Sequence, residues 1–135
     1  MSEKTHTGRC HCGAVRYEVR LDLDDGASRC NCVMCTKLSC ANVAVKPEAF
    51  RLLAGEDLLT DYNKPGHTNH YPFCKRCGVH CFGRGDIPEL GGKYVSVHVN
   101  TLDDIDLARL RYKYWDGRHY NWDAGPRAEP WPVAR

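Results

Sequence analysis

The sequence predicts one mostly β domain in which metal-binding cysteines supply part of the core. Three observations favour this fold class: short segments of alternating apolar and polar residues, few helical signals, and nine cysteines among 135 residues. A chain of this length buries roughly two-thirds of its unfolded surface, which suits a single domain over residues 1–135. In a reducing compartment this cysteine count favours metal ligation over disulfides.

The first half of the chain contains two strand signals and one helical signal. Residues 14–21 alternate apolar and charged side chains, the pattern of a half-buried strand, and a loop is expected over 22–28. A second short strand is expected at 41–45. Residues 47–53 are expected to form one or two helical turns, because they begin with proline and Gly55 follows them.

The second half of the chain predicts strands joined by turns. The sequence Asn63-Lys64-Pro65-Gly66 is a strong turn signal, so segments 58–62 and 67–71 are expected to form a hairpin. Further strands are expected at 79–83, 94–100 and 110–115. A helical turn is expected within 103–110, and 116–135 is expected to be an ordered irregular tail packed by aromatic side chains.

Seven of the nine cysteines fall into three clusters. These are a CxC pair (Cys10, Cys12), a CxCxxC triple (Cys30, Cys32, Cys35) and a CxxC pair (Cys74, Cys77). Four sulfurs at about 2.3 Å from one zinc ion require sharply turning segments, and a glycine follows the second cysteine of each pair. The two pairs can therefore form a closed structural site that ties the first strand to the centre of the chain.

The remaining triple is the candidate catalytic site. Three protein ligands with an open fourth position is the arrangement that zinc adopts in enzymes, so two Zn²⁺ ions per chain are expected. The alternative is a second closed site completed by Cys40, Cys81 or a histidine. A site in which the triple shares a metal with Cys74 or Cys77 is less favoured, and iron remains an alternative to zinc.

Other polar and aromatic residues are weaker candidates, because each also has an ordinary role in packing, turns or solvent contact. Candidate proton donors or fourth ligands are His11, His70, His80 and His98. Candidate hydrogen-bond donors and cations for a substrate are Thr36, Lys37, Lys64, Arg84 and Arg118. Candidate pocket aromatics are Trp115, Tyr120, Trp122 and Trp131. The segment Asp116-Gly117-Arg118 is expected to form a turn.

Three motifs contain all seven clustered cysteines: Gly8-Arg9-Cys10-His11-Cys12-Gly13-Ala14-Val15-Arg16-Tyr17, Cys30-Asn31-Cys32-Val33-Met34-Cys35-Thr36-Lys37 and Phe73-Cys74-Lys75-Arg76-Cys77-Gly78-Val79. Together they resemble the glutathione-dependent formaldehyde-activating enzyme (GFA) family, also called the CENP-V domain family. The resemblance covers nearly the whole chain, since it continues through Pro47-Glu48-Ala49-Phe50, Val99-Asn100-Thr101-Leu102 and Asp116-Gly117-Arg118.

The resemblance implies the family's β-tent fold, built from small antiparallel sheets around zinc. It implies structural zinc on the two pairs and catalytic-type zinc on the triple. The implied activity is that of a carbon–sulfur lyase, which activates a small thiol such as glutathione for addition to formaldehyde or a similar small aldehyde, or for its release. The alternatives are a zinc-stabilised protein- or chromatin-binding module without catalysis, and a thiol redox or metal sensor.

Charge and hydropathy argue against two classes of partner. The 19 Lys and Arg residues are interleaved with 17 Asp and Glu residues, so the net charge is only +2 and no nucleic-acid partner is expected. No apolar run approaches the roughly 18 residues of a membrane-spanning helix, and residues 1–5 lack the apolar core of a signal peptide. We expect a cytoplasmic protein without a membrane partner, and a homodimer remains open.

Overall fold

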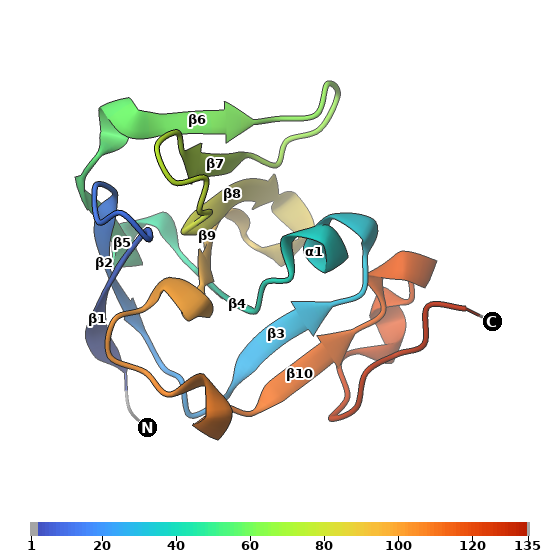
Figure 1. Cartoon of the computed structure of the whole chain (residues 1–135). Helices are drawn as coiled ribbons and strands as arrows, with labels where there is room; N and C mark the ends of the chain where they lie inside the picture. The colour runs from blue at the N-terminus through green and yellow to red at the C-terminus, as the bar shows by residue number, and fades with distance from the viewer. Residues whose placement is uncertain (1–2, 135) are drawn as a thin grey trace.

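The computed structural model describes residues 3–134 as ten short strands, one short α-helix and several 3-10 turns (Figure 1). The strands form three small sheets, which confirms the mostly β fold class. Among the described residues, no helix has both the length and the apolar character needed to cross a membrane.

The first sheet has three antiparallel strands in the order β1, β2, β5. Their bounds are Lys4–Arg9, Arg16–Leu21 and Phe50–Ala54. The predicted strand at 14–21 is confirmed, because Val15, Tyr17, Val19 and Leu21 are all buried. Strand β1 was not predicted, since its residues are mostly polar and only His6 and Gly8 are buried.

The second sheet has five strands in the order β10, β3, β4, β9, β8. Their bounds are Tyr112–Trp115, Ala27–Cys30, Asn42–Val45, Gly92–His98 and Phe82–Ile87. Strands β3 and β10 pair in parallel, whereas the other pairs are antiparallel. The third sheet is the antiparallel pair β6 (Leu59–Tyr62) and β7 (Tyr71–Cys74).

The helical prediction at 47–53 was largely wrong. Only Pro47–Ala49 forms a 3-10 turn, and the following residues form β5, in which half-buried Phe50 and Leu52 alternate with exposed Arg51. The α-helix is instead α1, Val33–Leu38, within the cysteine triple. No residue of α1 is buried, so it shows no apolar stripe from which the sequence could predict it.

Several predicted boundaries were shifted. The hairpin exists as β6 and β7, but its second strand begins at residue 71, after a loop over 63–70. The strand expected at 79–83 lies at 82–87 as β8, and 99–101 forms a 3-10 turn after β9. The expected turn within 103–110 is found at 107–109, and the last strand is confirmed as β10.

The core lies where the first sheet packs on the second. Phe50 bridges them, with its ring 5.4 Å from that of Tyr17 on β2 and 4.6 Å from that of Phe82 on β8. The Tyr17 hydroxyl donates to Thr101 Oγ1 at 2.6 Å, and the Thr101 hydroxyl donates to the carbonyl of His98 at 2.8 Å. This buried chain of hydrogen bonds joins β2 to the end of β9.

We expect Tyr17→Phe to lower the free energy of unfolding by about 1 kcal/mol, because it removes a buried hydrogen bond and leaves an acceptor unpaired. Urea unfolding followed by circular dichroism measures the loss. The control is Tyr62→Phe, since Tyr62 is 49% exposed and its hydroxyl should be solvated. Equal stability of the two variants would contradict the prediction.

Candidate metal centres and the adjoining cavity

The two cysteine pairs come together at the junction of the first and third sheets. The sulfurs of the cysteine quartet (Cys10, Cys12, Cys74, Cys77) all lie within 4.8 Å of one another. The Cys12 sulfur lies 3.6 Å from that of Cys10 and 3.7 Å from that of Cys74. A regular ZnS₄ tetrahedron with bonds of 2.3 Å has sulfurs about 3.8 Å apart, so the quartet has the spacing that zinc requires.

Local backbone geometry explains how each pair turns. Gly13 and Gly78 have φ values of +80° and +77°, as the sequence argument expected of the glycines after each pair. Their amides donate to the carbonyls of Cys10 and Cys74, which closes each turn. The amide of Val15 donates to the Cys10 sulfur at 3.3 Å, a contact that favours a thiolate there.

The cysteine triple (Cys30, Cys32, Cys35) forms a second group, again with all sulfurs within 4.8 Å. Cys30 ends β3, Cys32 caps α1, and Cys35 lies in the first turn of that helix. The amide of Cys32 donates to the Cys30 sulfur at 3.4 Å, and the amide of Cys35 donates to the Cys32 sulfur at 3.3 Å. Within residues 3–134, neither Cys40, Cys81 nor a histidine completes this group.

The three thiols of the triple influence one another's ionisation. Hydrogen bonding from Cys30 lowers the pKa of the Cys32 thiol, whereas hydrogen bonds with Cys30 and Cys32 raise the pKa of Cys35. Three adjacent thiolates repel one another unless a positive charge lies between them. All nine cysteines lie within the described residues and none forms a disulfide. Soft sulfur donors at this spacing suit zinc, and both groups could bind a metal ion.

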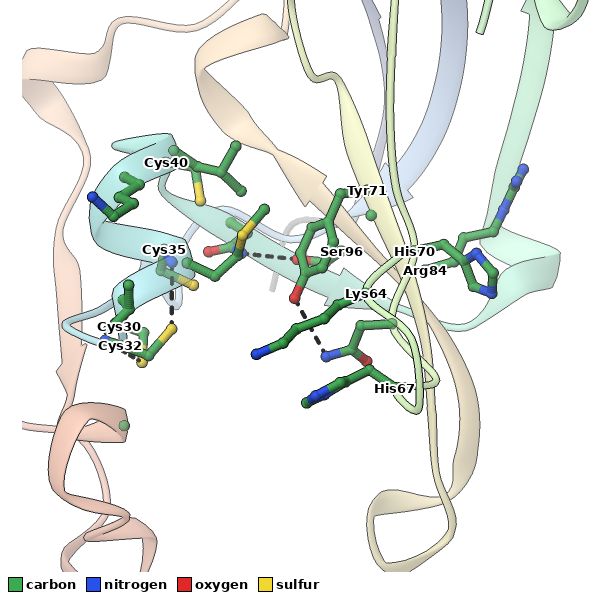
Figure 2. A pocket seen from close by; sticks show the side chains of 18 of the residues that line it. Cys30, Cys32, Cys35, Cys40, Lys64, His67, His70, Tyr71, Arg84 and Ser96 are labelled. Atoms are coloured by element: carbon green, nitrogen blue, oxygen red, sulfur yellow. Dashed lines mark hydrogen bonds between the residues drawn. The ribbon is translucent and has the colours of Figure 1, made fainter. Parts of the chain in front are cut away.

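A cavity of about 760 Å³ opens beside the triple (Figure 2). Four cationic side chains line it: Lys37, Lys64, Arg84 and Arg118. Within the described residues no aspartate or glutamate lines this cavity. Figure 2 shows Cys30, Cys32 and Cys35 on one side, with Lys64 and His67 on the opposite side. These four cationic side chains make the cavity suited to an anionic ligand.

The four candidate histidines differ in their position relative to the cavity and in their hydrogen bonds. His11 is exposed between Cys10 and Cys12, and His80 lies outside the cavity. His70 lines the cavity but pairs with Asp61 at 2.5 Å. His98 also lines it, and burial lowers its pKa to about 4, so the ring is neutral. Its Nδ1 donates to the carbonyl of His80 at 3.0 Å, which leaves no proton to give to a substrate.

A pair of tyrosines in the cavity was missed by the sequence analysis. Tyr71 points into the cavity between the triple and Lys64 (Figure 2). Its hydroxyl accepts from Asn69 Nδ2 at 3.4 Å, and the Tyr94 hydroxyl donates to Asn69 Oδ1 at 3.5 Å. Burial raises the pKa of Tyr71, so its hydroxyl keeps its proton at neutral pH. No motif in the sequence signals these residues.

The candidate residues of the C-terminal tail divide into two groups. Tyr120 and Trp122 line the cavity, while Trp131 stacks on Arg127 and donates to the carbonyl of Tyr114. The predicted turn at 116–118 is confirmed in part as a 3-10 turn over Gly117–His119. That turn has more than a connecting role, because Gly117 lies against the Cys30 sulfur.

Comparisons with known proteins agree with this architecture. The family model described as "Glutathione-dependent formaldehyde-activating enzyme" matches residues 5–118. A Penicillium rubens protein named after the same enzymes is 36% identical in an alignment of 103 residues that covers 71% of this chain. This chain spans about half, 52%, of that relative's length. A crystal structure of a Rhodobacter sphaeroides protein superposes with a TM-score of 0.67 at 26% identity, covering 93% of this chain and 99% of that one.

The two cysteine groups should respond differently to substitution. We expect native protein to contain two zinc ions, Cys32→Ala to contain one and stay folded, and Cys74→Ala to lose its fold, because Cys74 is buried where two sheets meet. Inductively coupled plasma mass spectrometry and circular dichroism measure both effects. Cys40→Ala should keep both ions, because the Cys40 thiol contacts Cys35 but lies outside both groups. Unfolding of Cys32→Ala would contradict the division into two sites.

Proposed function

Because the chain belongs to the glutathione-dependent formaldehyde-activating enzyme family, we propose that it catalyses the reversible addition of a small thiol to formaldehyde or a similar small aldehyde. Glutathione is the first thiol to consider. One observation carries the proposal: a cysteine triple without a fourth ligand in the described residues opens onto a cavity lined by four cations and no carboxylate. This would be carbon–sulfur lyase chemistry.

We assign different roles to the two cysteine groups. The quartet would hold a structural zinc ion, since four sulfurs saturate a tetrahedral metal. The triple would hold a second zinc ion and leave its fourth position to the substrate sulfur. Zinc bound there would keep a substrate thiol in its nucleophilic thiolate form at neutral pH.

The cavity suits glutathione in charge and size. Glutathione carries two carboxylates at neutral pH, and lysine and arginine side chains are the natural partners of carboxylates. Lys37 lies beside the triple on α1, whereas Lys64 lies on the opposite wall, so cations are available at both ends of an extended ligand. A volume near 760 Å³ lies in the range of small-molecule sites and can accommodate a tripeptide.

Tyr71 is the side chain that we assign as proton donor. As the substrate sulfur attacks the aldehyde carbon, a carbon–sulfur bond forms and the π electrons of the carbonyl move to its oxygen. The Tyr71 hydroxyl would give its proton to that oxygen, and solvent would then return a proton to the phenolate. Asn69 holds the Tyr71 ring in place through the hydrogen bond to its hydroxyl. The reverse sequence releases the aldehyde.

The cavity favours this reaction over the two alternatives. A binding module needs an exposed surface, and a redox or metal sensor needs only the thiols themselves. Neither role calls for a cationic cavity with a tyrosine near the sulfurs. A catalyst of thiol addition would use the cations to bind an anionic thiol and the tyrosine to donate a proton.

The direct test is formaldehyde exchange at equilibrium. Zinc-loaded protein, glutathione and ¹³C-formaldehyde are mixed, and exchange between free formaldehyde and S-hydroxymethylglutathione is measured by nuclear magnetic resonance. We expect the native chain to accelerate exchange and Cys35→Ala to match the uncatalysed rate. If the native chain carries two zinc ions and gives no acceleration with glutathione or with a smaller thiol, the proposed function is wrong.

Tyr71→Phe should lower kcat by about a hundredfold, which is the smaller end of what a positioned proton donor contributes. The dissociation constant for glutathione should change little, because the ring and its packing remain. Exchange kinetics and isothermal calorimetry separate the two effects. Tyr112→Phe is the control, since the Tyr112 hydroxyl donates to the carbonyl of Leu107 outside the cavity. If the Tyr71→Phe variant keeps the native kcat, a group other than Tyr71 donates the proton.

A further inference from the structure

A buried carboxylate that the proposed reaction does not use lies behind the cysteine triple. Asp116 is 4% exposed, and its oxygens accept from three side chains. Asn31 Nδ2 donates at 2.9 Å, His119 Nδ1 at 2.8 Å and Asn121 Nδ2 at 3.4 Å. Burial of a carboxylate is costly unless such bonds compensate it, so this arrangement calls for a physical role.

Asn31 connects this carboxylate to the triple, because it is the middle residue of the Cys30-x-Cys32 segment. Both ends of its side-chain amide are engaged: Nδ2 donates to Asp116, and Oδ1 accepts from the amide of Arg118 at 2.9 Å. Its carbonyl also accepts from Arg118 Nε at 2.9 Å. The segment between two candidate ligands is therefore held by three hydrogen bonds from residues 116–118.

The same turn touches the triple directly. A Cβ atom on Gly117 would lie 2.5 Å from the Cys30 sulfur and 3.2 Å from Cys32 Cβ, so only glycine fits there. Strand pairing explains the proximity: β3 and β10 run in parallel, with Trp115 opposite Cys30. Parallel strands end at the same edge of a sheet, so the residues after Trp115 emerge beside those after Cys30 (Figure 1).

The far side of Asp116 is anchored as well. His119 Nδ1 contacts the carboxylate, and its Nε2 contacts the carbonyl of Val133 at 3.1 Å. The ring therefore connects the Asp116 carboxylate to the backbone of the C-terminal tail. The turn that contains Asp116 and the C-terminal tail therefore hold the carboxylate in the position in which it binds Asn31.

We propose that Asp116, acting through Asn31, is a positioning residue that sets the geometry of the cysteine triple and hence its affinity for metal. This rests on the proposed function, in which the triple holds zinc. Groups that orient metal ligands from behind typically contribute 10–100-fold to metal affinity. Asp116 does not touch the cavity, so its effect passes through Asn31 and the adjacent backbone.

The quartet supplies an internal reference for the test. Full-length protein is loaded with Co²⁺, and its thiolate-to-cobalt absorption is followed during titration with a chelator, without any substrate. We expect two cobalt ions in the native chain. Asn31→Asp places a negative charge against Asp116 and should lower the affinity of one site 10–100-fold while the other site is unchanged. Asp116→Asn alone should weaken the same site.

The double variant Asn31→Asp with Asp116→Asn exchanges the two partners and provides a rescue. The amide at position 116 can donate to the carboxylate at position 31, which can still accept from the Arg118 amide, so affinity should recover towards the native value. Asn121→Ala is the matched control, because it removes a hydrogen bond from Asp116 that does not lead to the triple. It should keep both sites, and thermal unfolding should confirm that each variant is folded.

Two results would overturn the inference: equal weakening of both cobalt sites in Asn31→Asp, or native affinity in that variant. Failure of the double variant to recover affinity would also count against it. Because no substrate is present, the outcome is independent of catalysis. The variants could weaken one cobalt site while the native chain fails to accelerate formaldehyde exchange. That result would support Asp116 as a positioning residue and refute the proposed function.

Discussion

The approach of four sulfurs from distant segments to within 4.8 Å of one another organises this small domain. Cys10 and Cys12 follow β1, whereas Cys74 ends β7, so bringing the quartet together fixes how the first and third sheets meet. Cys10 and Cys74 also belong to the buried core. Short strands with few large apolar side chains therefore share their packing role with clustered thiols, as expected of a domain stabilised by metal.

Cysteines also form the triple, but their arrangement there differs from that in the quartet. Its three sulfurs come from one continuous segment, which bends from β3 into α1, so they need no long-range closure to approach one another. What distinguishes this group is its surroundings, because one side faces a cationic cavity and the other is packed against a hydrogen-bonded turn. This contrast supports the proposal that one group is structural and that the other takes part in chemistry.

Local patterns predicted the features that depend on neighbouring residues. Alternation gave the buried face of β2 correctly, and cysteine spacing separated the two groups that the structure brings together. The errors share a cause: β5 was mistaken for a helix, and α1 was missed, because their conformations depend on strand pairing and on the cysteine triple. Asp116 was named only as part of a turn, because its role depends on a contact with Asn31 that spans 85 residues. Tyr71 and Asn69 were missed because their roles depend on a cavity that is built from several distant segments.

The parallel pairing of β3 with β10 has a consequence for the order of events during synthesis. Cys30 leaves the ribosome early, but Asp116 and Arg118, which hold Asn31, are 85 and 87 positions beyond Asn31 in the chain. Long-range contacts of this kind form only after the intervening chain is available, and closing the large loop costs entropy. The triple therefore acquires its final shape only after residues 112–118 have been synthesised, so a nascent chain would expose these thiols until β10 is in place.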